Sequence, residues 1–294
     1  MNSGISRRKF LGISAAAAGA VALAIGADGL GWEPYHPRVV ALELQFPHWP
    51  AALDGFRIAQ LSDLHYDPYL GTAPIEIAVR LTNEQSPDLI ALTGDFVTLP
   101  FVENRATRRR SAGHAEPCAR LLKSLQSKHG SFAVLGNHDE FSDPDVVTRS
   151  LQGQRIEVLR NRAVPIEHNG ARFFLAGVND VLGGDADLDT AMRGIATAEP
   201  VVLLAHEPDF ADDAARYPIG LQLSGHSHGG QIRIPYLWPL FLPALARTYP
   251  KGLYQVGELS LYTNVGIGTI HVPMRWNCPP EITIVTLRCG GRQR

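Results

Sequence analysis

Short polar blocks rich in Asp, Asn and His recur along this sequence, each directly after an apolar run. Together they supply two carboxylates, one amide and four imidazoles, from Asp63, His65, Asp95, Asn137, His206, His226 and His228. This mixture of oxygen and nitrogen donors suits Mn, Fe or Zn, and it is large enough for two metal ions if one carboxylate bridges them. Burying these groups together without a cation would leave unpaired polar atoms and like charges side by side. The blocks therefore predict a metal centre.

The elements that must position these blocks follow from the apolar pattern. Apolar runs end just before the blocks, and we predict strands there at 56–61, 89–92, 132–135, 201–204 and 220–223. The intervening stretches predict helices at 75–85, 116–128, 144–152, 188–196 and 209–215. This alternation favours an α/β fold with largely parallel central strands. Ligands of such sheets bind beyond the carboxyl ends of the strands, so blocks far apart in sequence should converge.

The second half of the chain has a different pattern, with more strands and fewer helices. Strands are predicted at 155–159, 163–167, 172–175, 260–265 and 281–287, in addition to one at 38–46 near the start. This distribution suggests a second, more mixed sheet, hence a β-sandwich flanked by helices. We treat residues 38–290 as one domain.

Composition excludes several classes of protein. Of the 294 residues, 45% are hydrophobic, which excludes wholesale disorder. The net charge of −2 provides no basic field, so a nucleic-acid partner is not expected. Three cysteines are an odd number, so a disulfide framework does not hold this fold together.

The polar blocks, taken in order, resemble those of the calcineurin-like metallophosphoesterases. The matching blocks are Asp63-Leu64-His65, Gly94-Asp95, Gly136-Asn137-His138-Asp139, His206 and Gly225-His226-Ser227-His228. The resemblance implies a four-layer α/β/β/α sandwich with the site at the carboxyl ends of its strands. It also implies two metal ions that share Asp95. One would be held by Asp63, His65, Asp95 and His228, and the other by Asp95, Asn137, His206 and His226.

The same resemblance implies a phosphoesterase, and a phosphodiesterase in particular. A hydroxide that bridges the two metals would attack phosphorus, His138 as an imidazolium would serve as the general acid, and Asp139 would orient His138. The expected substrate is a cell-envelope or lipid-linked phosphate ester. One alternative is a pyrophosphate hydrolase of the UDP-2,3-diacylglucosamine type, and another is a non-catalytic metal-binding scaffold. The complete set of motif residues disfavours the scaffold.

An uncharged stretch lies between Ile234 and Ala246, directly after the last polar block. Its prolines exclude a regular helix, and its apolar residues are Tyr236, Leu237, Trp238, Leu240, Phe241 and Leu242. Two interpretations stay open: a cover over the sandwich edge, or a lipid-facing lip beside the metals. Similar stretches occur in a membrane-associated branch of the family that the chain resembles. Candidate substrate contacts are Trp238, Phe241 and Arg275.

A run of arginines follows the Asp95 block, at Arg105, Arg108, Arg109 and Arg110. We expect these residues in a loop. The loop is either simply solvated or a contact to an anionic membrane surface or envelope substrate.

Residues 1–31 are set apart from the domain. Ser6-Arg7-Arg8-Lys9-Phe10-Leu11 precedes a weakly apolar run at 12–27 and resembles a twin-arginine export signal. An ordinary secretory signal or an uncleaved anchor is the alternative. The apolar run is shorter than the roughly 20 residues that span a bilayer. The protein is therefore expected to use the export machinery and to be periplasmic or associated with the cell-envelope membrane, with cleavage left open.

Overall fold

Two six-stranded sheets pack face to face in this computed structural model, which describes residues 6–68, 71–239 and 241–290. The first sheet has the order β1 (Arg38–Phe46), β12 (Glu281–Cys289), β2 (Arg57–Leu61), β3 (Leu89–Thr93), β4 (Ser131–Val134) and β5 (Ile156–Val158). The second has the order β10 (Gly252–Val256), β11 (Leu259–Thr263), β9 (Leu221–Ser224), β8 (Val201–Leu204), β7 (Ala171–Gly177) and β6 (Arg162–His168).

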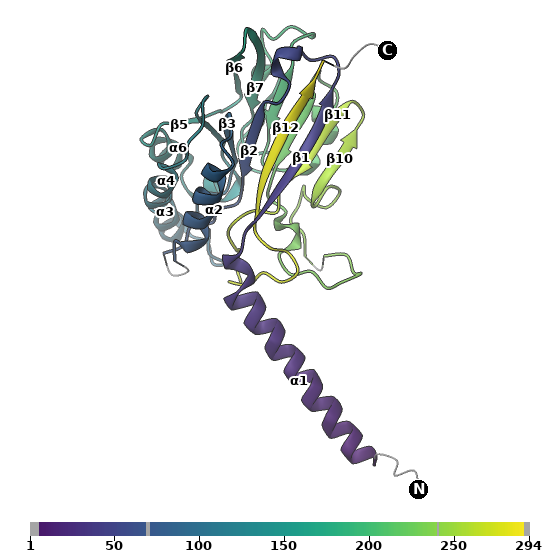
Figure 1. Ribbon diagram of the computed structural model, residues 1–294. Coiled ribbons are helices and arrows are strands. Elements are labelled where there is room, and N and C mark those ends of the chain that lie inside the picture. Colours follow the sequence, from purple (N-terminus) through teal and green to yellow (C-terminus); the bar gives the residue numbers. More distant parts are fainter. Residues whose placement is uncertain (1–5, 69–70, 240, 291–294) are drawn as a thin grey trace.

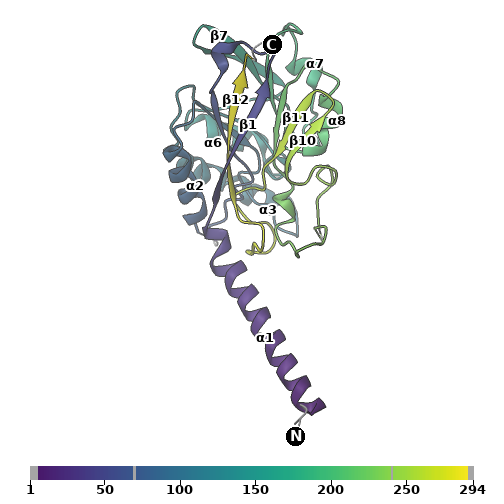
Figure 2. The same cartoon turned by 45° about the vertical axis from the view of Figure 1, so that its right-hand side comes forward.

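Helices cover the outer faces of both sheets. The first sheet is covered by α2 (Ala73–Glu84), α4 (Ala115–Leu122) and α6 (Pro144–Gln152), with α3 (Arg105–Ala112) and α5 (Asn137–Ser142) nearby (Figure 1). The second sheet is covered by the short α7 (Leu188–Ala191) and α8 (Ala211–Ala214) (Figure 2). Short 3₁₀ turns lie at Glu33–Tyr35, Ala51–Leu53, Pro208–Phe210 and His228–Gly230. This arrangement confirms the predicted four-layer sandwich.

Both sheets are mixed, but their central strands are parallel. β2, β3, β4 and β5 run parallel to one another, and so do β7, β8, β9 and β11. The strands β3, β8 and β9 are buried along their whole length, which explains the nearly continuous apolar sequences of β3 and β8. The parallel strands of each sheet end at one edge, so the polar blocks that follow them are gathered there.

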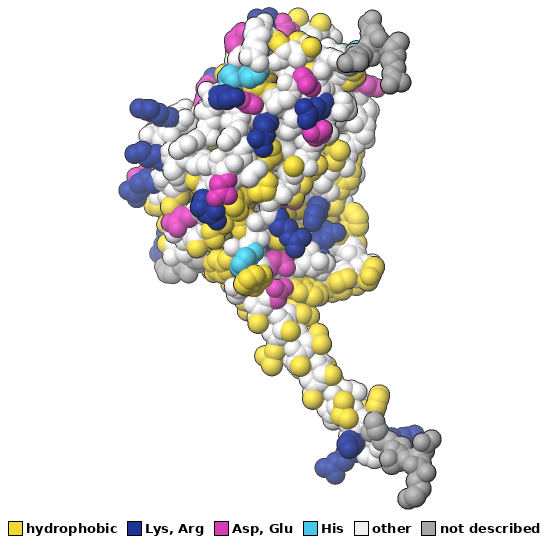
Figure 3. Space-filling model, viewed as in Figure 1, with side chains coloured by type: hydrophobic (Ala, Val, Ile, Leu, Met, Phe, Trp, Pro, Cys, Tyr) yellow, Lys and Arg dark blue, Asp and Glu magenta, His cyan; other side chains and the backbone are white. Residues whose placement is uncertain are grey.

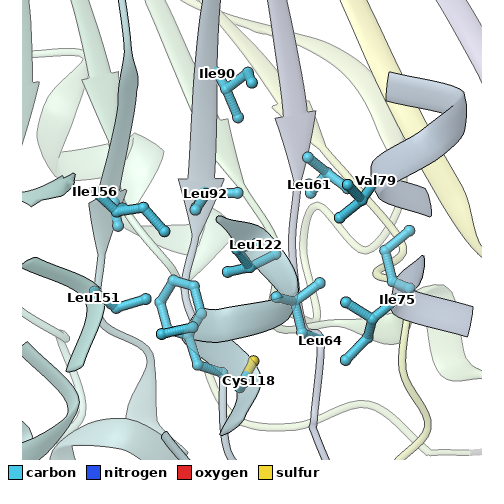
Figure 4. Packing of buried hydrophobic residues seen from close by; sticks show 14 of the residues in the cluster. Leu61, Leu64, Ile75, Val79, Ile90, Leu92, Cys118, Leu122, Leu151 and Ile156 are labelled. Atoms are coloured by element: carbon cyan, nitrogen blue, oxygen red, sulfur yellow. The ribbon is translucent and has the colours of Figure 1, made fainter. Parts of the chain in front are cut away.

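Apolar side chains fill the three interfaces between the four layers. Leu61, Leu92 and Ile156 of the first sheet pack against Val79 of α2 and Leu122 of α4 (Figure 4). Between the sheets, the core includes Phe56, Phe173 and Leu287. A third cluster lies under α7 and α8. These cores fix the relative position of the strands, and hence of the site at their ends.

Several predicted helices are shorter than expected. The helix predicted at 116–128 ends at Leu122, before a polar stretch that closes at Gly130 with a φ of +88°. The helix predicted at 188–196 ends at Ala191, and Gly194 has a φ of +82°, which a right-handed helix excludes. The helix predicted at 209–215 is a 3₁₀ turn followed by α8.

The arginine run lies in a helix, so the predicted loop is wrong. Asn104 begins α3 by accepting hydrogen bonds from the backbone of Ala106 and Thr107, and Thr107 returns one to the Asn104 backbone. In this reciprocal cap the Thr107 hydroxyl oxygen accepts from the Asn104 backbone N–H, so donors that a helix start leaves unpaired are satisfied. Strand β10 was not predicted at all. It forms a hairpin with β11 around Gly257, and a glycine between two short apolar runs is the signal that could have found it.

The N-terminal helix α1 (Arg7–Gly31) projects from the body (Figures 1 and 3). It is longer than the apolar run seen in the sequence, because the helix includes the basic residues before it and continues through Asp28. Its length and composition would allow it to cross a membrane, a property that signal sequences share. The helix thus agrees with a signal or an anchor. Residues 1–5 of the predicted signal and Leu240 of the uncharged stretch lie outside the described residues.

Candidate metal centre

Seven candidate ligands converge at the carboxyl ends of five strands, three in the first sheet and two in the second. The loops after β2, β3, β4, β8 and β9 supply them in turn: Asp63, His65, Asp95, Asn137, His206, His226 and His228. All except Asn137, which is partly exposed, are buried. The convergence follows from the parallel arrangement, because each strand delivers its polar block to the same edge.

The backbone at the ligands is unusual. Five of them adopt a φ between +44° and +65°, a region that side chains other than glycine rarely occupy: Asp63, His65, Asp95, His226 and His228. Hydrogen bonds between loops maintain this conformation, such as the bond from the Asp63 N–H to the Gly94 carbonyl. Such strain concentrates at functional sites, where the surrounding structure can hold it.

The donor atoms form two groups that meet at Asp95, and a third group, made of His65, Asp95 and His138, overlaps both of them. Asp63, His65 and His228 lie within 4.8 Å of one another, as do Asp95, His206 and His226. Asp95 Oδ2 lies 3.4 Å from His65 Nε2 and 3.2 Å from His206 Nε2. One carboxylate oxygen therefore lies within reach of both groups.

Hydrogen bonds on the far side of the rings aim two histidines at this centre. His206 Nδ1 lies 2.6 Å from the Thr93 carbonyl, and His226 Nε2 lies 2.8 Å from the Ala244 carbonyl. A carbonyl can only accept, so each of these nitrogens carries the proton. The other nitrogen of each ring, His206 Nε2 or His226 Nδ1, is left as the potential ligand atom, in the way that outer partners orient metal-binding histidines.

The electrostatics of these residues fit metal cations. His206 Nε2 and Asn137 Oδ1 are buried without a hydrogen-bond partner. Burial raises the pKa of Asp63 to about 6 and lowers the pKa of His65 to about 3. Burial also acts to lower the pKa of His206, but the Asp95 carboxylate outweighs it and raises that pKa well above its ordinary value. The site thus favours positive charge beside Asp95, which bound cations would supply.

His138 lies beside the centre with its ring oriented by the backbone. Its Nδ1 accepts a 2.8 Å hydrogen bond from the Leu99 N–H, so the neutral ring carries its proton on Nε2. The imidazolium expected from the sequence would lose this bond, because both of its nitrogens carry protons. This hydrogen bond therefore favours a neutral imidazole over the expected imidazolium.

Asp139 does not orient His138 as expected. Its carboxylate accepts hydrogen bonds from the backbone N–H groups of Phe96, Val97 and Gly136. These bonds connect the loop after β3 to the start of α5, and burial raises the pKa of Asp139 to about 8. Asp139 thus supports the two loops that carry Asp95 and His138, and it acts on the His138 ring only through them.

Arg275 is also placed differently from the expectation of a substrate contact. It is completely buried, and its guanidinium donates to the carbonyls of Val265, Gly268 and Cys278. Its Nη2 lies 3.5 Å from His228 Nδ1. No spacing in the sequence could reveal this role, which holds together the loop that packs behind a candidate ligand.

We expect Arg275→Met to lower the free energy of unfolding by at least about 2 kcal/mol, because it leaves three carbonyls without their donor. Chemical denaturation of the full chain measures this loss. Arg288→Met is the control, since Arg288 is partly exposed and pairs with Glu43 at the surface, and should cost less than about 1 kcal/mol. Equal stability of the two variants would contradict the role of Arg275.

Gly225 is a second position where the structure predicts that substitution has a large effect, here on metal content and stability. A Cβ there would overlap Ser62 Oγ and Asp63 Oδ2. We expect Gly225→Ala to displace Asp63 and to reduce metal content, at a cost in stability of about 1–3 kcal/mol. Metal analysis of the purified chain is the measurement, with Gly31→Ala as the control because nothing lies within 4 Å of a Cβ at Gly31. Full metal content in Gly225→Ala would refute this packing argument.

A cleft of about 550 Å³ opens beside the candidate ligands. Its floor includes Asp95, Asn137, His138, His226 and His228, and its walls are mainly apolar, from Phe101, Ile232, Phe241, Pro243, Ile270 and Val272. Of the three candidate substrate contacts, Phe241 therefore lines the cleft, and Trp238 is exposed on the same segment. Sequence reasoning missed Phe101, which stacks on His271 with ring centroids 3.9 Å apart.

The sandwich and its Asp/His centre define a metallophosphoesterase, a hydrolase that acts on phosphate esters. The family model described as calcineurin-like phosphoesterase matches residues 56–230. The chain belongs to this family.

Relatives align with nearly the whole chain. It is 32% identical to the uncharacterized metallophosphoesterase YkuE of Bacillus subtilis, over 97% of this chain and 98% of the relative. It is also 32% identical to the phosphodiesterase YaeI of Escherichia coli, over 96% and 99%. The UDP-2,3-diacylglucosamine pyrophosphatase LpxG of Chlamydia trachomatis is 29% identical, over 87% and 90%.

Proposed function

We propose that this protein is a dinuclear-metal phosphodiesterase whose two metals share Asp95. One metal would be held by Asp63, His65, Asp95 and His228, and the other by Asp95, Asn137, His206 and His226. The observation that carries the proposal is the position of Asp95 Oδ2, 3.4 Å from His65 Nε2 and 3.2 Å from His206 Nε2. The donor set suits Mn, Fe or Zn.

Each protein group has a defined task in this reaction. When bound, the two metals supply the Lewis acidity that activates water and neutralises charge on the phosphoryl oxygens. The Thr93 and Ala244 carbonyls hold the rings of His206 and His226 in the orientation for binding. His138 presents its Nε2–H, since Leu99 occupies Nδ1, and donates a hydrogen bond from it that stabilises the charge on the leaving oxygen; the proton that this oxygen finally takes up comes from water.

The cleft supports a substrate that is partly apolar. A phosphodiester would bring its charged phosphate to the polar floor at Asp95 and His138, and its apolar group to Phe101, Ile232 and Phe241. We therefore propose a lipid-linked or other cell-envelope phosphate ester as substrate. The twin-arginine motif and α1 support export and retention at the cell-envelope membrane.

A second candidate function is cleavage of a UDP-2,3-diacylglucosamine-type pyrophosphate. The apolar cleft favours it, and LpxG is named for this activity. This chemistry uses a nucleotide-linked lipid on the cytosolic side of the membrane, so the location of the domain discriminates the two candidates. A reporter fused to the C-terminus measures that location: an exported reporter supports the envelope substrate, and a cytosolic one supports the nucleotide-lipid.

A substrate panel on the full chain tests the proposed reaction. The metal-free chain would be loaded with Mn, Fe or Zn and assayed with aryl phosphate monoesters, aryl phosphodiesters, UDP-diacylglucosamine and phospholipids. We expect metal-dependent hydrolysis, faster for diesters than for monoesters. A chain that binds these metals and hydrolyses none of the esters would instead be the non-catalytic scaffold.

A further inference from the structure

Helix α1 is joined to the body by a fixed connection. Gly29, near its end, is buried, and its carbonyl accepts a 2.9 Å hydrogen bond from the Arg275 N–H. A Cβ at Gly29 would overlap Met274. Just after the helix, the Glu33 carboxylate accepts hydrogen bonds from the Asn277 and Cys278 N–H groups. The direction in which α1 leaves the body is therefore set by its contacts with residues 274–278.

The same loop borders the cleft. Ile270, His271 and Val272, a few residues before the α1 contacts, line the cleft wall. Arg275 then connects both parts, because its backbone N–H binds Gly29 and its guanidinium binds the carbonyls of Val265 and Gly268. The base of α1 and the mouth of the cleft thus belong to one packed unit.

Large apolar side chains are exposed around this mouth. We call them the apolar rim, and they come from three segments: Phe101 and Val102; Ile234, Tyr236, Leu237, Trp238 and Phe241; and Val272. Figure 3 shows hydrophobic side chains gathered on the edge of the body from which α1 leaves. An exposed apolar patch of this kind marks a surface that contacts another apolar phase.

Helix α1 indicates which apolar phase the rim contacts. No charged residue lies between Lys9 and Asp28, and only Gly29 of the helix is buried. A helix that is apolar all round needs a protein core or lipid around it, and this one projects away from the body. The uncharged part of the helix, residues 10–27, extends about 27 Å, close to the thickness of a hydrocarbon core of about 30 Å, and charged residues lie at both of its ends. Lipid is thus the surrounding that fits α1.

We infer that the apolar rim rests in the interface of the same bilayer that α1 crosses, with the cleft mouth facing the lipid. The enzyme would then take amphiphilic phosphate esters laterally from its own membrane, their acyl chains entering between Phe101 and Phe241. Only the inference about substrates rests on the proposed function; the position of the apolar rim in the bilayer interface does not.

A fluorescent probe on the apolar rim tests whether the rim rests in the bilayer interface. The full chain with Tyr236→Cys, labelled with an environment-sensitive dye, would be reconstituted into vesicles of phosphatidylethanolamine and phosphatidylglycerol with brominated acyl chains. The three native cysteines are buried, which directs labelling to position 236. Leu253→Cys is the matched control, exposed on β10 along the flank of the body. We expect a blue shift and bromine quenching at 236 and neither at 253.

Two results would overturn the inference that the apolar rim rests in the bilayer interface. One is a dye at position 236 whose emission in vesicles is as characteristic of water as that of the dye at position 253. The other is a probe at 236 already shielded in detergent by a second copy of the chain and unchanged by lipid. Neither result depends on metal loading or on hydrolysis.

Paired substrates test the lateral access. In the same vesicles, Tyr236→Ser combined with Leu237→Ser should leave hydrolysis of a water-soluble aryl phosphodiester unchanged. It should slow hydrolysis of an aryl phosphodiester that carries two acyl chains by roughly tenfold, whereas Leu253→Ser should slow neither. Equal rates on the acylated ester for variant and parent would refute lateral access. A parent chain that hydrolyses neither ester would refute the proposed function and leave the fluorescence result standing.

Discussion

Replacing Asp95 by Ala is expected to reduce phosphodiester hydrolysis by roughly 10³-fold or more and to leave fewer than two metals bound per chain. The loss follows from geometry, because Asp95 Oδ2 lies within 3.4 Å of a histidine nitrogen in each donor group. Metal-ion catalysis contributes several kcal/mol of transition-state stabilisation, and each 1.36 kcal/mol is a factor of ten in rate. Elemental analysis and kcat/KM on the same preparation measure both effects.

Asp95→Asn separates the metal role of this residue from its structural role. Asp95 Oδ1 also accepts a 2.9 Å hydrogen bond from the backbone N–H of His138, and the amide oxygen of Asn can keep that bond. We therefore expect Asn to preserve more stability than Ala while still weakening the metal centre, since it lacks the negative charge. Retention of two metals by Asp95→Ala would show that the metals do not share this carboxylate.

The second large loss of activity is expected when His138 is replaced. His138→Ala should lower turnover by roughly 10²–10⁴-fold with metal content unchanged. The residue is not among the proposed ligands, and its Nε2–H is available because Leu99 donates to Nδ1. Because this proton assists departure of the leaving oxygen, the loss should be greater for alkyl than for nitrophenyl leaving groups.

A series of leaving groups therefore provides the measurement for His138. His114→Ala is the matched control, since His114 is partly buried before α4 and lies outside the cleft lining. It should keep the parent rate with every substrate. If His138→Ala retains full turnover, or loses the same factor for all leaving groups, the role of His138 as hydrogen-bond donor to the leaving oxygen is wrong.

Much of the fold could be predicted from local pattern. The runs that became β2, β3, β4, β8 and β9 are short and apolar and end at polar blocks, so their type and approximate bounds were predictable. Helix ends were less predictable: α7 ends at Ala191, and Gly194, with a φ of +82°, prevents a helix from continuing to the predicted end at 196. The edge strand β10 was missed, since none of its five residues is fully buried and its apolar signal is weak.

The sequence by itself determined which side chains make the candidate centre, because parallel strands deliver their polar blocks to one edge regardless of the distance between blocks along the chain. Tertiary structure alone decided how these side chains are held. The ring of His138 accepts from the Leu99 N–H, 39 positions away, and Asp139 binds backbone groups of a different loop. Arg275 was expected from the sequence to contact substrate, yet backbone carbonyls bind it in the interior. Spacing cannot reveal such contacts, since hydrogen bonds between distant segments form only once packing has fixed the loops.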